Sequence, residues 1–412
     1  MSSLWMRQTT WAAVAIAIFG AGAGVLHALP STSAASSAPS TAIASNDVVS
    51  RAGDSESEVS ASLASAADGS LAVAWIADSG GRDGGGRYVG VRVSEPNAGK
   101  LGPLRKITTP GERVSDDSVV ALSGGDFLVT WAAGKSVYSA RVSRDGVSAP
   151  VLVASSASHP RAAVTPGGTV LVSFAFDEGA KKGLALAVSH DGKTFARRDV
   201  GPSPDEGELS AVCGDDQTAL VVAAVEPRGV VVHRVALESD SPADTSTVST
   251  IGEHVARQAP SCFVSPQEAF VVYGQTERPQ DPGDSRIAET LVFVRSRDGA
   301  RNFVTRAAHR TPSHLLLPTI VHREGAFTLL AVMGSGAGDA HASASVIVLG
   351  ADGRSQTGLT RTVVAPMTMV AAPDAAGWLG DSLGLAIAGG VTWAAVPDNG
   401  GGEAHVALVR VL

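Results

Sequence analysis

Apolar residues after residue 50 occur in short runs that begin at a turn residue and repeat along the chain. Seven runs share one form, in which Gly or Gln opens a stretch that is rich in Val, Leu, Ala and aromatic residues. They are GSLAVAW ending at Trp75, GDFLVTW at Trp131, GTVLVSF at Phe174, QTALVVA at Ala223, QEAFVVY at Tyr273, GAFTLLA at Ala331 and GVTWAAV at Val396. No helical 3.6-residue period occurs in this part, so the pattern predicts an all-β chain.

Each run is the second strand of a predicted four-stranded unit. A small-residue apolar strand precedes it, a third strand such as YVGVRVS from Tyr88 follows, and a shorter fourth strand such as LRKIT at Leu104 ends the unit. Antiparallel four-stranded units spaced by roughly 43 to 65 residues are typical of β-propeller blades. Two β-sandwich domains are the alternative, because sandwiches also repeat strands regularly. The small residues of the first strands suit a crowded axis and favour the propeller.

The seventh unit ends the chain after three strands, near 383–388, 391–396 and 404–412. A propeller closes its ring so that no strand edge stays unpaired. We therefore expect the missing outer strand to come from Asn46 to Ser50, the first β-like residues of the chain. This predicts a single seven-bladed propeller over residues 46–412, with six blades as the alternative.

The N-terminal residues 1–29 are predicted to be a signal peptide or an N-terminal membrane anchor. Arg7 precedes the uncharged run Gln8 to Leu26, and a Ser/Ala/Pro-rich linker follows at 30–45. The small residues Ser31 to Ala35 suit cleavage, while the run is also about long enough to span a bilayer. Both readings predict export to the periplasm, the cell surface or the medium. The membrane would be contacted only through this segment, if it is not cleaved.

The two cysteines and the net charge narrow the picture further. Cys213 and Cys262 would meet an oxidising compartment, where a pair tends to form a bridge. In the repeat register both fall on the first strands of units four and five, so we expect a disulfide, with two buried free thiols as the alternative. The formal net charge of −8 argues against a nucleic-acid partner, which would require a basic face.

The turn between the third and fourth strands carries a short motif in units two, three and five, and a reduced form, Ala351-Asp352-Gly353, in unit six. The Ser and Asp side chains can accept hydrogen bonds from nearby backbone N–H groups, Gly can supply a positive φ, and in units three and five an aromatic residue follows. The motif resembles the Asp-box, or bacterial neuraminidase repeat Ser-x-Asp-x-Gly-x-Thr-Trp, of sialidase-like propellers. Phe replaces the Trp, and units one and four lack the motif. The motif residues are Ser143, Asp145, Gly146, Ser189, Asp191, Gly192, Phe195, Ser296, Asp298, Gly299 and Phe303.

That resemblance implies a structural role for these turns, since the family places them on the face away from its active site. The ligand face would then be formed by the loops between second and third strands and by the blade-to-blade segments. The blade-to-blade segments carry Arg113, Asp116, Asp117, His159, Arg161, Asp205, Glu206, Glu208, His254, Arg257, His309, Arg310 and His314.

Catalytic sialidases hold a substrate carboxylate with three arginines, and they use a Tyr nucleophile paired with Glu and an acidic proton shuttle. The resemblance therefore makes Arg113, Arg161 and Arg257 ligand-binding candidates, and Asp117 the candidate acid if the chain is an enzyme. However, the family's early Arg-Ile-Pro motif is missing. The three tyrosines, Tyr88, Tyr138 and Tyr273, lie at the ends of predicted strands, outside the family's nucleophile context.

We therefore predict a non-catalytic binding module for a glycan or a protein surface at the cell envelope. The alternatives are a divergent exo-sialidase-type glycoside hydrolase and a structural envelope protein. No cofactor or metal is predicted. Calcium is the alternative, because Asp78 and Asp83 in a Gly-rich loop offer oxygen ligands, although their spacing fits no EF-hand.

Overall fold

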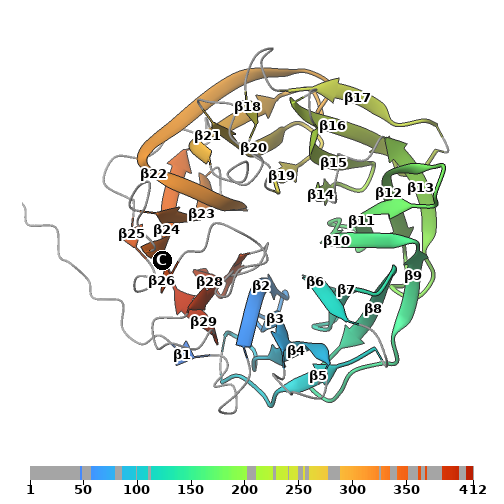
Figure 1. Cartoon of the computed structure of the whole chain (residues 1–412), viewed down its shortest axis with the longest axis vertical. Helices are drawn as coiled ribbons and strands as arrows, with labels where there is room; N and C mark the ends of the chain where they lie inside the picture. The colour runs from blue at the N-terminus through green and yellow to red at the C-terminus, as the bar shows by residue number, and fades with distance from the viewer. Residues whose placement is uncertain are drawn as a thin grey trace, which may run out of the picture. The chain divides into compact units, whose positions relative to one another are not determined.

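The computed structural model describes residues 47–48, 57–78, 86–98, 100–109, 113–201, 210–225, 229–239, 241–248, 254–255, 259–276, 288–323, 326–334, 341–350, 361–362, 367–368, 383–398 and 405–411. They all belong to one unit, Ile43–Leu412. Their regular elements are β-strands (Figure 1). Over these residues no helix has the length and apolar character needed to cross a membrane.

The first four blades are separate four-stranded antiparallel sheets whose strands follow chain order. The first contains β2 (Ser57–Ser65), β3 (Leu71–Asp78), β4 (Arg87–Val93) and β5 (Arg105–Ile107). The second contains β6 (Val114–Ala121), β7 (Phe127–Ala133), β8 (Ser136–Val142) and β9 (Val151–Ser155). The third contains β10 (Ala157–Val164), β11 (Val170–Asp177), β12 (Lys182–Ser189) and β13 (Ala196–Gly201). The fourth contains β14 (Ser210–Gly214), β15 (Thr218–Val225), β16 (Gly229–Ala236) and β17 (Asp244–Thr247).

The fifth and sixth blades form one nine-stranded sheet. Its strands are β18 (His254–Val255), β19 (Ser261–Val264), β20 (Ala269–Thr276), β21 (Ala288–Ser296), β22 (Phe303–Arg323), β23 (Ala326–Gly334), β24 (His341–Gly350), β25 (Arg361–Thr362) and β26 (Met367–Thr368). The 21-residue strand β22 joins the two blades, because its first part pairs with β21 and its second part with β23.

The continuity of β22 corrects one expectation from the sequence. His309, Arg310 and His314 were predicted to lie in a blade-to-blade loop, and this prediction was wrong. His309 pairs with Leu291 of β21, and His314 pairs with Gly334 of β23. The chain stays extended because its first part is hydrogen-bonded to β21 and its second part to β23. A register shift near Ala288 accommodates the extra residues of β22.

The seventh blade closes the ring with both ends of the domain. It contains β27 (Gly384–Ala388), β28 (Val391–Asp398), β29 (His405–Arg410) and β1 (Asp47–Val48). Strand β1 pairs with β29 through Asp47↔Leu408 and Val48↔Ala407, as the truncated seventh repeat predicted. The prediction of an all-β, seven-bladed propeller is confirmed.

The innermost strands of successive blades pack against one another around the ring. Contacts run from β2 through β6, β10, β14, β19, β22 and β27 and back to β2. Figure 1 shows several of these strands around the middle of the domain. The hydrophobic core lies between neighbouring blades, where the second strands bury their side chains on both faces. Trp75, Trp131 and Phe174, which end three of the seven repeats, are fully buried.

The predicted disulfide is confirmed. Cys213 on β14 and Cys262 on β19 are bonded, with their Cα atoms 5.9 Å apart and a sequence separation of 49 positions. The bond therefore links the inner strands of blades four and five. Both side chains contact the apolar cluster between these two blades.

Candidate functional site

A cavity of about 200 Å³ lies where the inner strands converge, and each of the seven blades contributes to its lining. Most lining side chains are small, as expected at a crowded axis. The charged residues in the lining are Asp117 and Arg161. The full lining is Ser62, Leu63, Asp117, Ser118, Val119, Arg161, Ala162, Ser210, Ala211, Val212, Ala259, Pro260, Ser261, Cys262, Pro318, Thr319, Leu383, Gly384 and Leu385.

Hydroxyl side chains occupy the same register position in four of the inner strands. Each stands opposite the residue before the end of a repeat run; the pairs are Ser62↔Ala74, Ser118↔Thr130, Ser261↔Val272 and Thr319↔Leu330. We call these four residues the hydroxyl layer. Because inner strands touch their neighbours at the axis, a short hydroxyl at this height can reach the next blade.

Three members of the hydroxyl layer bond to the backbone of the next blade. Ser118 Oγ accepts from Ala162 N at 3.1 Å, and Ser261 Oγ accepts from Ile320 N at 3.2 Å. Thr319 Oγ1 donates to the Leu383 carbonyl at 3.2 Å. These bonds give backbone groups of the inner strands a partner on the neighbouring blade, and they place hydroxyl side chains among the apolar residues of the lining.

Asp117 is the exceptional residue of the lining. It stands opposite Trp131, a register position that Ala61 and Ser210 occupy in blades one and four. The residue is 1% exposed, and its Oδ2 accepts a 2.5 Å hydrogen bond from Ser62 Oγ. The other oxygen, Oδ1, is buried and accepts no hydrogen bond from the described residues. A buried carboxyl oxygen without a donor is unusual and is expected to have a function.

Burial raises the pKa of the Asp117 carboxyl to about 6. The hydrogen bond from Ser62 and the charge of Arg161 oppose this shift, while the neighbouring Asp116 adds to it. The loss of hydration therefore has a larger effect on the pKa than the two favourable contacts, and the ionised carboxylate is destabilised at this position.

Arg161 brings a positive charge to the same part of the cavity. It lies on β10 and is half-buried. Its Nη1 donates to the Pro160 carbonyl at 3.2 Å and to the Asp117 carbonyl at 3.4 Å. The arginine of blade three thus contacts the backbone of blade two beside the buried carboxyl.

A β-bulge near the start of three inner strands sets this geometry. Ser60, Asp116 and His159 have φ values of 56°, 47° and 52°, and each lies at a register shift between the first and second strands of its blade. A bulge changes the alternation of side chains, which here separates the directions of Asp116 and Asp117. The sequence placed Asp116, Asp117, His159 and Arg161 in loops; this was wrong, because the strands continue past the bulge.

The bulged residues of blades two and three form an ion pair. His159 Nδ1 lies 3.2 Å from Asp116 Oδ2. Burial alone would raise the pKa of Asp116, but its hydrogen bond with His159 and the charges of His159 and Arg161 hold that pKa below its usual value. Asp116 is thus paired within the protein, whereas one oxygen of Asp117 accepts no hydrogen bond from the described part of the chain.

The structure brings only part of the predicted arginine set together. Arg161 lines the cavity with Asp117, whereas Arg113 is exposed before β6 and is not part of the lining. Arg257 lies outside the described residues. Tyr88 and Tyr273 are buried in the core between blades, and Tyr138 stacks on Trp131 with ring centroids 6.0 Å apart. None of the three tyrosines lines the cavity.

The calcium alternative gains no support here. Asp78 is the last residue of β3, and Asp83 lies outside the described residues. In the part of the chain that the structure describes, no three His, Cys, Asp or Glu side chains are grouped to hold a metal ion.

The Ser-x-Asp-Gly turns of blades three and five share one hydrogen-bond pattern. Asp191 Oδ1 accepts from Lys193 N and Thr194 N at 2.7 and 2.8 Å. Asp298 Oδ1 accepts from Arg301 N and Asn302 N at 3.1 and 2.9 Å. Gly192 and Gly299 have φ values of 67° and 69°. The aromatic residues that follow, Phe195 and Phe303, pack against the cores between blades.

The blade-two turn differs. Ser143 Oγ accepts from Asp145 N and Gly146 N at 3.1 and 3.2 Å, but the Asp145 carboxylate accepts none of the corresponding backbone bonds. The backbone N–H groups of Thr194 and Lys193 hold the pKa of Asp191 well below its usual range. The Ser296 hydroxyl, followed by Asn302 N, does the same for the pKa of Asp298. None of these turn residues lines the axial cavity.

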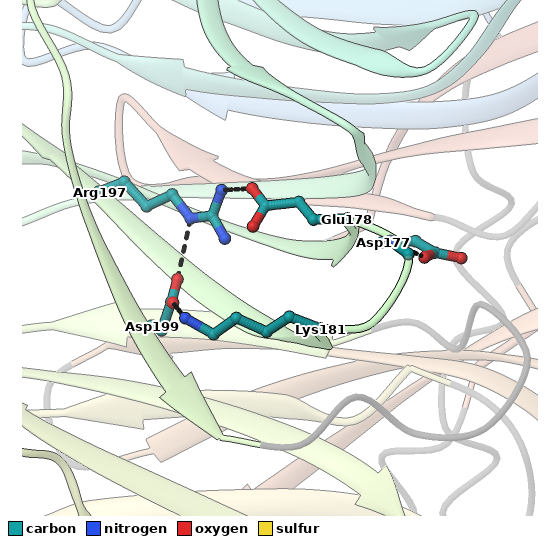
Figure 2. A network of polar contacts seen from close by, with 6 residues as sticks. Asp177, Glu178, Lys181, Arg197 and Asp199 are labelled. Carbon is teal, nitrogen blue, oxygen red and sulfur yellow. Dashed lines mark hydrogen bonds and ion pairs between the residues drawn. The ribbon is translucent and has the colours of Figure 1, made fainter.

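A second polar cluster lies on blade three (Figure 2). Arg197 pairs with Glu178 at 2.5 Å and with Asp199 at 2.9 Å, and Lys181 pairs with the other oxygen of Asp199 at 2.5 Å. The Arg197 guanidinium also lies over the Phe176 ring, 4.1 Å from its centroid. Opposite charges are matched within this cluster and it encloses no cavity, so we assign it a stabilising role in the blade.

A closed ring of seven four-stranded blades around an axial cavity defines a β-propeller. No protein-family model matches the sequence, and no curated protein is similar to it in sequence. The solved structures that match do so through their fold.

A Trypanosoma rangeli sialidase in complex with 2,3-difluoro-KDN matches with a TM-score of 0.51 and 9% identity, over 86% of this chain and 54% of that chain. The GH93 α-L-arabinofuranosidase of Fusarium graminearum has a TM-score of 0.48 and 12% identity, over 86% and 93% of the two chains. A Hadza microbial sialidase has a TM-score of 0.47 and 13% identity, over 69% and 65%.

The chain thus spans just under two thirds of the Hadza sialidase and about half of the T. rangeli chain. At these identities the matches show the fold alone. The chain shares the β-propeller fold of the T. rangeli sialidase.

Proposed function

We propose that this chain is a non-catalytic binding module that holds the end of a glycan in its axial cavity. One observation carries the proposal. Among the described residues no donor reaches one buried carboxyl oxygen of Asp117, and the cavity that Asp117 lines offers hydroxyl side chains and one arginine among small apolar residues. Sugar hydroxyls both donate and accept hydrogen bonds, which matches such a lining. The cavity is smaller than the roughly 300–1,000 Å³ of sites that enclose a whole drug-sized ligand, so it suits a chain end.

The absence of a second catalytic group from the lining supports binding without turnover. Glycoside hydrolases use a pair of carboxyl groups on either side of the scissile bond, or a tyrosine in place of one. Among the described lining residues, Asp117 is the one carboxylic acid, and all three tyrosines are placed elsewhere. Asp116 is engaged by His159.

A divergent glycoside hydrolase is the second candidate, and one observation favours it. The pKa of Asp117, raised to about 6, is suited to a general acid working near neutral pH. Incubation of purified protein with a fluorogenic sialoside separates the two functions. We expect no release of fluorophore, and turnover that is lost in Asp117→Asn would establish the hydrolase instead.

The binding function is tested with a glycan microarray followed by calorimetry on the strongest glycan. Arg161 lies on β10, the first strand of blade three, and Arg113 directly precedes β6, the first strand of blade two. Of these two arginines, only Arg161 lines the cavity. They are therefore a matched pair. Arg161→Gln should weaken binding, whereas Arg113→Gln should leave it unchanged. Equal effects of the two substitutions would place the site elsewhere, and a blank array would contradict the proposal.

The disulfide supports export, because such bonds persist in oxidising compartments. We place the protein at the cell envelope or outside the cell. N-terminal sequencing of the mature protein tests this: a start after about residue 30 indicates a cleaved signal peptide. An intact N-terminus in the membrane fraction indicates an anchor, and an intact N-terminus in the cytosol would contradict export.

A further inference from the structure

We infer that the axial cavity selects an uncharged sugar, one hydroxyl of which donates a hydrogen bond to Asp117, over the corresponding acidic sugar. The inference rests on the proposed function, since it names the ligand class for the same site. It concerns a contact that the carboxyl of Asp117 makes with the ligand.

The first step is the state of the Asp117 carboxyl. Its Oδ2 is engaged by Ser62, and its Oδ1 is buried with no donor among the described residues. Leaving a buried acceptor without a partner costs about 1–3 kcal/mol, so a ligand that supplies a donor gains that free energy. A sugar hydroxyl supplies a donor without bringing a second charge into the cavity.

The charges around the cavity argue against an acidic sugar. Arg161 is the basic residue of the described lining, and its Nη1 donates to backbone carbonyls. Two acidic side chains, Asp116 and Asp117, lie close to Arg161. The charge of Arg161 acts to lower the pKa of each, although burial still raises the pKa of Asp117. A ligand carboxylate would therefore meet no surplus of positive charge. Placed beside Asp117 Oδ1, it would also repel the side chain.

The hydroxyl layer offers complementary contacts for a polyol. The oxygens of Ser118 and Ser261 already accept from backbone N–H groups, so their hydroxyl hydrogens can be donated to a ligand. Thr319 Oγ1 already donates to the Leu383 carbonyl, so its oxygen can accept. The layer thus offers donors in blades two and five and an acceptor in blade six, and vicinal sugar hydroxyls can use both kinds of contact.

The test uses two ligands that differ at one carbon. One pair is methyl glucoside and methyl glucuronide, and the other is methyl galactoside and methyl galacturonide. In each pair C6 is a CH₂OH group in the neutral member and a carboxylate in the acidic member. Saturation-transfer NMR and calorimetry at pH 7.5 with the wild-type chain should show binding to the neutral member of a pair. The acidic member should bind at least about tenfold more weakly, which corresponds to roughly 1.4 kcal/mol.

The variant arm compares Asp117→Asn with Arg113→Gln, each checked for folding by thermal unfolding. Asp117→Asn should weaken neutral-sugar binding about tenfold or more, and Arg113→Gln should not change it. Tighter binding of the acidic member, or an unchanged affinity in Asp117→Asn, would overturn the inference and leave glycan binding standing. Failure of every array glycan and both ligand pairs to bind would overturn the proposed function itself.

Discussion

Ser62 Oγ on the inner strand of blade one donates a 2.5 Å hydrogen bond to Asp117 Oδ2 on the inner strand of blade two. The two residues are 55 positions apart in sequence, and both line the axial cavity. The bond engages one carboxyl oxygen, while the other accepts no hydrogen bond from the described residues. It stabilises the carboxylate too little to offset burial, because the pKa of Asp117 is still raised to about 6.

The fold should therefore gain stability when Asp117 is replaced by Asn. The pKa of Asp117 is about 6 in the folded state, higher than its ordinary value of 3.8. The favourable contribution of the protonated carboxyl to the free energy of unfolding is therefore fully present below about pH 4 and is lost as the pH rises through 6. By linkage the loss at pH 7.5 is on the order of 3 kcal/mol. Urea unfolding should show Asp117→Asn to be more stable than wild type at pH 7.5.

The same comparison at pH 4 provides the control. The gain should disappear there, because the wild-type carboxyl is then protonated as well. Asp116 and Arg161, the charged groups nearby, are unchanged in the variant. A variant less stable than wild type at pH 7.5 would show that Asp117 stabilises the fold, and the case for its role in binding would weaken.

Two aspartates in equivalent turns should respond differently to truncation. Asp298→Ala removes the acceptor for Arg301 N and Asn302 N, whereas Asp145→Ala removes no such bond. The lowered pKa of Asp298 means that its stabilisation is present above about pH 4 and is lost as the pH falls below that value. Asp298→Ala should therefore lower the melting temperature at pH 7, and the difference should shrink near pH 3. Equal melting temperatures for the two variants at pH 7 would contradict this.

The disulfide should make a large contribution to stability. It closes a loop of 49 residues, for which the loss of chain entropy in the unfolded state predicts about 4 kcal/mol. The double variant Cys213→Ala/Cys262→Ala should unfold at lower urea concentration by a corresponding amount. Reductant should bring the wild type to the same midpoint and leave the double variant unchanged. Two free thiols in non-reducing mass spectrometry of the wild type would refute the bond.

Gly90 on β4 should tolerate no side chain. A Cβ at this position would lie 2.5 Å from Cε2 of the fully buried Trp75. Overpacking of this kind typically costs about 1–3 kcal/mol. Gly90→Ala should lower the melting temperature and alter the near-ultraviolet circular dichroism, while Gly146→Ala, whose Cβ would meet no atom within 4 Å, serves as control. Similar effects of both substitutions would indicate a general glycine effect rather than contact with Trp75.

Much of the fold could be predicted from the sequence because blade geometry is encoded locally. Each second strand is buried on both faces, so it forms an uninterrupted apolar run after a turn residue, as in the run that ends at Trp131. The closing pair of Asp47 and Leu408 could be inferred because a ring cannot leave an edge open. The disulfide followed from the same register.

The site was less predictable because its contacts cross between blades. Asp117 was named as a candidate, but no local pattern links it to Ser62. The positive φ values of Ser60, Asp116 and His159 also lack a sequence signal, since these residue types usually adopt other conformations. The β22 segment resembles a loop in sequence because Pro312 lies among His309, Arg310 and His314, yet pairing with two different strands keeps it extended.

Strand β22 ties blades five and six into one cooperative unit. Neither blade can leave the ring without breaking backbone hydrogen bonds that belong to the other. Amide protons of β21 and β23 should therefore exchange with solvent through a common opening event, while each of the first three blades can open by itself. Because the disulfide also links blade four to blade five, the seven blades would respond to applied force as five elements, with blades four to six as the widest segment of the ring.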